Sequence, residues 1–272
     1  MIPSGIITLT TDFGSGPFPG IMKGVILGIC PHARIVDIAH DVPAQDVWHA
    51  AVVVEQLVGY FPTGTVHVVV VDPGVGTKRR AIVVRTKREW FVAPDNGVLT
   101  RVLGPGVEVR EVAESRYCLE EISNTFHGRD VFAPVAAHLA MGADMRDMGP
   151  VVDDPFVLPW PEVKRQGQWV EGEVVRVDPF GNLGTNIPAE LVEKALGQWE
   201  GHVELVQEGR VLARGRLVPS YGWAEPGEVV GVRDSMNRLE LAVNQGSMLR
   251  VLGLERSQAR GLKVRAGPLE GG

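Results

Sequence analysis

The stretch Val66-His-Val-Val-Val-Val-Asp-Pro-Gly-Val-Gly-Thr-Lys-Arg-Arg80 decides the fold of the first half of this chain. Its run of β-branched residues predicts a strand that is buried on both faces, as in a parallel sheet. The run stops at Asp72, and the Pro-Gly-Val-Gly that follows turns the chain sharply. Asp72 therefore stands at the carboxyl edge of a core strand, which is where open α/β sheets bind ligands.

Arg79 follows Asp72 on the same loop and is close enough in sequence to fold back on it. Two interpretations of this pair stay open. It is either an ion pair across a tight surface turn or part of a ligand site built from several strand ends.

The segments before and after this strand alternate between strand-like and helix-like patterns. That order predicts parallel βαβ units with right-handed crossovers. Asp46 has the residue type and position of a helix N-cap, and Pro31 ends the helix before it. In this half we expect strands at 5–12, 34–38, 66–72, 81–84 and 90–93, and helices at 19–29, 47–60 and 131–140.

The loop Gly14-Ser-Gly-Pro-Phe-Pro-Gly20 has some likeness to a dinucleotide-binding loop, but the match is poor. Its glycine spacing is one residue too long, and Pro17 and Pro19 remove backbone N–H groups that a pyrophosphate needs. Asp12, at the end of the first strand, is better placed to accept hydrogen bonds from a sugar diol.

Composition excludes several classes of protein. The 272 residues carry a formal net charge of −6 with pI near 5.7, which argues against general nucleic-acid binding. Cys30 and Cys118 are far apart and have no metal-type spacing, so a disulfide scaffold and a zinc site are not expected. The N-terminus lacks a signal-peptide pattern, and no apolar run approaches the ~18 residues of a membrane helix. We expect a cytoplasmic protein that binds neither membrane nor nucleic acid.

The second half of the chain has a different texture. A proline-rich segment at 151–165 predicts a linker between an α/β domain at 1–150 and a β-barrel domain at 166–272. The short alternating strands beyond it favour a small antiparallel barrel or sandwich. We expect strands at 168–177, 202–206, 211–217, 228–232, 239–243 and 248–252, with a helix at 188–196. The predicted fold is therefore an α/β N-terminal domain with a largely parallel sheet, followed by an all-β, barrel-like domain.

Three further loops carry unusual combinations of side chains. His127 precedes a helix and lies between Phe126 and the sequence Gly-Arg-Asp130, whose acid suits a helix N-terminus. In the second half, Asp178-Pro-Phe-Gly-Asn-Leu-Gly-Thr-Asn186 offers an aromatic ring to stack on a base and amides to read polar edges. Asn244-Gln245-Gly246 ends a strand where backbone groups can bind a purine edge. For each loop, an ordinary polar turn is the alternative.

Taken together, these motifs resemble the S-adenosyl-L-methionine (SAM) hydroxide adenosyltransferase family, the SAM hydrolases related to fluorinase and chlorinase. Six motifs in the same order cover nearly the whole chain. They are Thr11-Asp-Phe-Gly14, Val71-Asp-Pro-Gly-Val-Gly76, Ala93-Pro-Asp-Asn-Gly97, Phe126-His-Gly-Arg-Asp130, Phe180-Gly-Asn182 and Leu239-Glu-Leu-Ala-Val-Asn-Gln-Gly246.

The resemblance implies an α/β domain, a β-barrel, and a homotrimer with active sites between neighbouring subunits. It also implies that SAM is the substrate, that no cofactor or metal takes part, and that adenosine and L-methionine are the products. The family's hydrolytic triad falls on Asp72, Arg79 and His127. Halogenating relatives have a Tyr at the position of Asp72 and a Ser at the position of Gly128, so the halide-binding pattern is missing here.

The resemblance also implies a set of substrate-binding residues. Asp12 is expected to hold the ribose hydroxyls, and Asp178 and Ser235 the methionine end of SAM. Gly184 departs from the family pattern, because fluorinase has a Trp near the base there. The full expected set is Asp12, Phe13, Asn96, Phe126, Asp178, Phe180, Asn182, Ser235, Asn244 and Gln245.

This chemistry suits these residue types. Methionine leaves as a neutral sulfide, so no acid is needed on that side, whereas water needs a fixed position and a base. An Asp, an Arg and a His together can supply both. Two alternatives remain: a halogenase that forms a 5′-halo-5′-deoxyadenosine, and a SAM- or adenosine-binding protein without catalysis.

Overall fold

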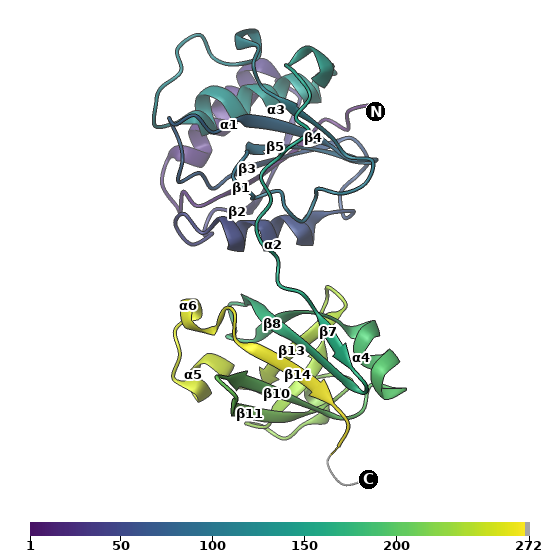
Figure 1. The fold of residues 1–272 in the computed structure, drawn as a ribbon. Coiled ribbons are helices and arrows are strands. Elements are labelled where there is room, and N and C mark those ends of the chain that lie inside the picture. Colours follow the sequence, from purple (N-terminus) through teal and green to yellow (C-terminus); the bar gives the residue numbers. More distant parts are fainter. Residues whose placement is uncertain (270–272) are drawn as a thin grey trace. The chain divides into compact units, whose positions relative to one another are not determined.

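The computed structural model describes residues 1–269, and the chain folds into two compact units, Met1–Leu158 and Pro159–Gly272 (Figure 1). Each unit has its own buried core. The last three positions of the predicted 166–272 domain lie outside the described residues.

The first unit is built on one mixed sheet with the strand order β2-β1-β3-β5-β4-β6. The neighbours β2, β1, β3 and β5 run parallel, and β4 is antiparallel to both β5 and β6. The α/β class with a mainly parallel sheet is therefore confirmed. The strands are β1 (Ile6–Thr11), β2 (Arg34–Ala39), β3 (Thr65–Val70), β4 (Ala81–Arg85), β5 (Glu89–Pro94) and β6 (Glu108–Glu111). β6 is not among the strands predicted from the sequence.

Helices cover both faces of this sheet (Figure 1). On one face α1 (Phe18–Ile29) and α3 (Ala133–Ala140) pack on alternate residues of β3, including Val66, Val68 and Val70. On the other face α2 (Val47–Leu57) packs on the intervening residues. Every residue of β3 is buried, as the apolar run predicted.

The helix expected at 131–140 begins earlier than predicted. Gly128–Phe132 forms a π-helical turn (η2) that leads directly into α3. Pro134 has no N–H to donate to the carbonyl of Asp130, and the N–H of Leu119 bonds to that carbonyl instead, at 2.9 Å. Such turns are frequent at functional sites, and this one directly follows His127. Short 3₁₀ turns, η1 (Ser115–Tyr117) and η3 (Met145–Asp147), lie on either side of this helix in the chain.

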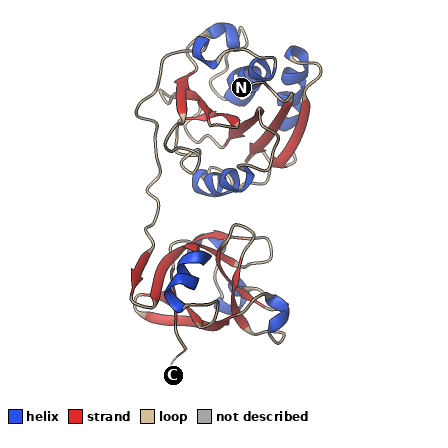
Figure 2. Ribbon diagram, turned by 90° about the vertical axis from the view of Figure 1, so that its right-hand side faces the viewer, coloured by secondary structure: helices blue, strands red, loops and turns tan. Residues whose placement is uncertain are grey.

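The second unit is a closed barrel, as the sequence predicted (Figure 2). Its strands follow the order β14-β10-β11-β12-β13-β9-β8, and pairing of β14 with β8 closes the ring. β7 extends the sheet outside this ring by pairing with β8. The strands are β7 (Lys164–Gln166), β8 (Trp169–Val177), β9 (Leu183–Pro188), β10 (His202–Gln207), β11 (Arg210–Leu217), β12 (Val229–Arg233), β13 (Arg238–Val243) and β14 (Lys263–Gly267). The helices are α4 (Ala189–Leu196), α5 (Met248–Leu252) and α6 (Arg256–Ala259), with a 3₁₀ turn η4 (Tyr221–Trp223).

Several predictions for this half were wrong in detail. The segment 248–252 is a helix, not a strand, because Ser247 caps its N-terminus and Gly253 ends it in the left-handed conformation. The expected linker ends in a strand, β7. β9 and β14 are not among the strands predicted from the sequence, and β11 pairs with β12 in parallel rather than antiparallel.

Candidate active site

Asp72 and Arg79 form a close ion pair at the carboxyl end of β3. Arg79 Nε lies 3.0 Å from each carboxylate oxygen of Asp72, and Nη2 also donates to Oδ2. Only 5% of the Asp72 side chain and 11% of the Arg79 side chain are exposed. The pair is therefore shielded from solvent, unlike an ion pair on an open surface turn.

The loop between these two residues requires glycine at position 76. Gly76 has φ 75°, and a Cβ there would lie 2.3 Å from the carbonyl oxygen of Asn124. The loop therefore packs closely on the segment that leads to His127. This contact brings together two loops that are far apart in the chain.

His127 completes the group. Arg79 Nη2 lies 2.8 Å from Nδ1 of His127. A guanidinium has no acceptor, so Nδ1 must accept this hydrogen bond, and the proton of the neutral ring is then on Nε2. Burial lowers the pKa of His127 below its usual range, and the positive charge of Arg79 lowers it further, against smaller opposing effects of Asp72 and Asp130. At neutral pH the ring is therefore an uncharged donor through Nε2.

Aromatic rings lie next to this group. The ring centres of Phe13 and Phe126 are 5.8 Å apart in an edge-on arrangement, and Phe18 contacts both. A Cβ at Gly128 would lie 3.2 Å from Met22 Sδ and from the Phe126 ring, and 3.4 Å from the Phe13 ring. Position 128 thus has little room for any side chain.

Asp12 lies just beyond β1, on a turn held by hydrogen bonds. Its Oδ2 accepts from the backbone N–H of Gln45 at 2.8 Å. The preceding Thr11 bonds through its hydroxyl to Nδ1 of His40 at 2.8 Å, and His40 Nε2 lies 3.0 Å from Asp37. The other oxygen of Asp12 has no hydrogen bond within residues 1–269 and remains able to accept from a ligand.

Asn96 uses its side-chain amide within the protein. Nδ2 donates to the carbonyl of Val71 at 2.9 Å, and Oδ1 accepts from the N–H of Val98 at 3.1 Å. Its neighbour Asp95 also bonds within the unit, to Arg80. The sequence predicts substrate binding by Asn96 and gives no role to Asp95, although both belong to the same Pro-Asp-Asn-Gly motif.

In the second unit, Asp178, Phe180 and Asn182 share one turn. Asp178 accepts from the N–H groups of Phe180 and Asn182 and from the Asn182 side chain, at 2.8–3.0 Å. Phe180 is 77% exposed, so its ring is free to stack on a planar group. Asn186, at the end of the same motif, is buried in β9, and its side chain bonds to the backbone of Glu173 and Pro161. Its amide therefore has a structural role and is not available to bind the polar edge of a base.

Phe180 and Gln245 line a pocket of 440 Å³ together with Pro179, Gly181, Gly246, Ser247, Leu249, Arg250 and Arg256. Asn244 lies beside it, but its side chain donates to the carbonyl of Ala224 and its backbone bonds to Gly227 and Glu228. Ser235 is exposed in the turn between β12 and β13. The pocket therefore includes some of the predicted binding residues of this unit but not all.

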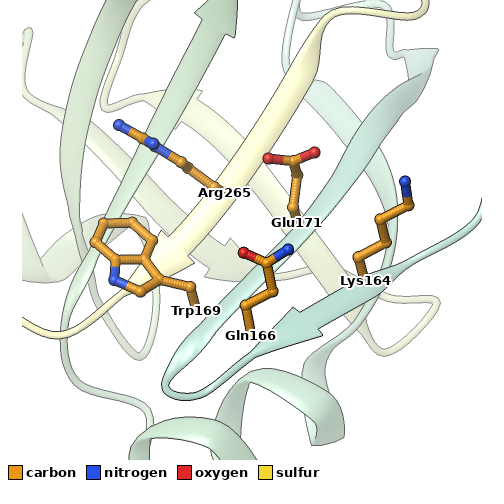
Figure 3. Close-up of a pocket in the computed structure, with 5 residues that line it drawn as sticks. All are labelled: Lys164, Gln166, Trp169, Glu171 and Arg265. Atoms are coloured by element: carbon orange, nitrogen blue, oxygen red, sulfur yellow. The ribbon is translucent and has the colours of Figure 1, made fainter. Parts of the chain in front are cut away.

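A second pocket, of 230 Å³, lies on the outer side of the barrel (Figure 3). Glu171 on β8 pairs in register with Lys164 on β7 and with Arg265 on β14. Positive and negative side chains therefore alternate across these three strands. Arg265 also pairs with Glu204, and its guanidinium lies 5.1 Å from the Trp169 ring centre. The lining of this pocket includes none of the predicted site residues.

Within residues 1–269, no group of three or more His, Cys, Asp or Glu side chains is arranged to hold a metal ion. None of the helices described is long and apolar enough to cross a membrane.

Comparison with known proteins gives a consistent result. The family model of the SAM hydroxide adenosyltransferase N-terminal domain matches residues 7–149, and that of the C-terminal domain matches residues 172–260. A protein of Salinispora tropica named (R)-S-adenosyl-L-methionine hydrolase is 37% identical over 98% of this chain and 100% of its own length. A fluorinase of Actinoplanes is 30% identical over 82% of this chain and 85% of its own.

A crystal structure is also similar to this chain. An uncharacterized conserved protein from Thermotoga maritima matches with a TM-score of 0.88 at 39% identity, covering 96% of this chain and 99% of that one.

Proposed function

The chain belongs to the SAM hydroxide adenosyltransferase family, and on that premise we propose that Asp72, Arg79 and His127 carry out its reaction. The reaction is hydrolysis of SAM to adenosine and L-methionine. The observation that supports this assignment is the shielded contact of the three side chains through one guanidinium.

The bonds of the reaction balance without a cofactor. The oxygen of water attacks C5′ of the ribose, the C5′–S bond breaks, and its electron pair returns to sulfur as a neutral thioether. One proton of the water is released. Because water and SAM supply every atom of the two products, we propose that no cofactor or metal takes part.

Each of the three residues has a distinct task in this proposal. The Nε2–H of His127 donates to the attacking water, because Nδ1 is occupied by Arg79. Asp72 accepts a proton of the water through Oδ1, which among the described residues bonds only to Arg79 Nε and so retains a lone pair. Arg79 holds the other two in place and stabilises the negative charge that develops on the oxygen.

The remaining predicted residues, with the exception of Asn96, form the substrate site in this proposal. Asp12, Phe13 and Phe126 come from the first unit, and Asp178, Phe180, Asn182, Ser235, Asn244 and Gln245 come from the second. Asn96 is left out because its side-chain amide already bonds to Val71 and Val98. Phe180 would stack on adenine, supported by its exposed ring. We further propose a cytoplasmic homotrimer with sites at subunit interfaces. Light scattering of the purified protein would test the number of subunits through the mass of the assembly.

The name of one relative supports a proposal about the form of the substrate. The protein from Salinispora tropica is named for (R)-SAM, and because the amino acid is already specified as L, the prefix describes the sulfonium centre. We propose that this chain also prefers the R sulfonium. Separate rate measurements on the two sulfonium diastereomers test this, and equal rates would contradict it.

The decisive experiment follows the oxygen atom. Purified protein incubated with SAM in ¹⁸O-labelled water should yield adenosine with the label at the 5′ oxygen. Recovery of intact SAM would indicate a binding protein, and formation of methylthioadenosine alone would indicate a different reaction. Excess chloride or fluoride should not divert the product to a halogenated nucleoside, since Asp72 and Gly128 replace the residues of the halogenases.

A further inference from the structure

Asp72 and Arg79 stand at the two ends of one loop, and the hydrogen bonds inside that loop join its residues to one another. Its turn is closed by the N–H of Val75 to the carbonyl of Asp72 at 3.2 Å and by Thr77 to Gly74. These bonds shape the turn but do not attach its ends to the sheet. The position of the two catalytic side chains therefore also depends on what holds Val71 and Arg80, the residues just outside the loop.

Two neighbouring residues directly after β5, Asp95 and Asn96, bond to both of these positions. At the first end, the side chain of Asn96 donates to the carbonyl of Val71 at 2.9 Å. At the second end, the N–H of Asp95 donates to the carbonyl of Arg80 at 2.9 Å. The Asp95 carboxylate also accepts from Arg80 Nε at 2.7 Å.

The pair is itself rigidly held. The Asp95 side chain is 3% exposed, and its second oxygen accepts from the N–H of Phe156 at 2.8 Å. The Asn96 oxygen accepts from Val98. Both side chains thus have the defined orientation that a positioning role requires.

We infer that Asp95 and Asn96 are positioning residues that hold the two ends of the 72–79 loop, so that the Asp72 carboxylate meets the Arg79 guanidinium. This inference rests on the proposed function of that pair. It gives Asn96 a different task from the substrate contact expected from the sequence. The physical reason is that a displacement of about 1 Å at a reacting group costs on the order of a hundredfold in rate.

The test replaces Asn96 by Asp, which keeps the shape but cannot donate to the Val71 carbonyl. For Asn96→Asp we expect kcat to fall roughly tenfold to a hundredfold while KM stays within about twofold. Gln207→Glu, the same change of amide to carboxylate at an exposed position of β10, should leave both unchanged. Thermal unfolding of each variant measures the folded fraction.

Two outcomes would overturn the inference. A raised KM with unchanged kcat would make Asn96 a substrate contact. A kcat loss that only follows the loss of folded protein would make its role structural. If Asn96→Asp does not fold, Asp95→Asn, which keeps the shape at the other end of the loop, is measured in the same way.

A second measurement does not depend on turnover. Displacement of Arg79 from His127 should raise the pH midpoint of the His127 ring signal in the nuclear magnetic resonance spectrum of Asn96→Asp. An unchanged midpoint would contradict the inference. If the wild-type protein fails to hydrolyse SAM, the proposed function fails, and this titration still tests whether the loop is held as inferred.

Discussion

The guanidinium carbon of Arg79 lies 5.3 Å from the centre of the Phe132 ring. Phe132 is fully buried and belongs to the π-helical turn that follows His127. The same guanidinium bonds to Asp72 and to His127. Arg79 is therefore held by a carboxylate, an imidazole nitrogen and an aromatic face, which come from two distant loops.

The aromatic contact should contribute to catalysis. For Phe132→Leu we expect kcat to fall about threefold to thirtyfold, because a desolvated cation–π contact contributes roughly 0.5–2 kcal/mol. Phe91→Leu is the matched control, since Phe91 is equally buried but lies against the α2 face of the sheet. Both variants should lose roughly 1–2 kcal/mol of unfolding free energy, measured in denaturant. Equal kcat values for the two variants would contradict a role for the ring.

Replacement of the Asp72 carboxylate by an amide should have a larger effect. For Asp72→Asn we expect kcat to fall about 10²–10⁴-fold with little change in KM, because the amide cannot accept the proton of water. Asp153→Asn, at an exposed position, should behave like the wild type. If calorimetry shows that Asp72→Asn binds SAM but no product forms, the variant is folded and is defective only in the chemical step. Retained turnover would remove Asp72 from the mechanism.

The pH dependence should reflect His127. Because its pKa is lowered on folding, the stability linked to this group is present above its usual pKa of about 6.5 and is lost as the pH falls through the lowered value. The neutral ring is also the active form in the proposal. We therefore expect an acid limb of kcat/KM below about pH 6.5.

Arg79 should control that titration. Arg79→Met removes a positive charge and leaves Asp72 unpaired, so the pKa of His127 should rise toward or above its usual range. The ring signals in nuclear magnetic resonance spectra measure this directly. His138 is the internal control, because burial alone lowers its pKa. A His127 midpoint that does not move would mean that Arg79 is not bound to the ring in solution.

The contact between the two loops can be tested through glycine. Gly76→Ala adds a methyl group where the Asn124 carbonyl lies 2.3 Å away, in addition to the strain of a positive φ. Gly106→Ala has the same type of φ, 79°, and an open surrounding, so it isolates the strain at about 1–2 kcal/mol. We expect Gly76→Ala to lose more stability than the control and roughly tenfold or more in kcat. Equal losses would show that the contact is unimportant.

The motifs around the active-site loops were visible in the sequence because their chemistry is local. An apolar run followed by Asp72 and a glycine-rich turn predicts a carboxylate at a strand end, and the structure has that strand and turn. The barrel was also predictable from alternating strands. The helix at 248–252 was not, because a short apolar run fits a strand as well as a helix, and only its caps at Ser247 and Gly253 distinguish them.

The sequence by itself determined which residue types stand at the ends of the strands and the order of two different folds along the chain. Only the tertiary structure decided which nitrogen of His127 carries the proton, because that depends on the bond from Arg79, 48 positions away in the chain. The contacts of Asn96 with Val71 and of Phe132 with Arg79 are likewise visible only in the tertiary structure. Local patterns record the preferences of neighbouring residues, whereas these contacts arise when distant strand ends and loops meet at one edge of the sheet.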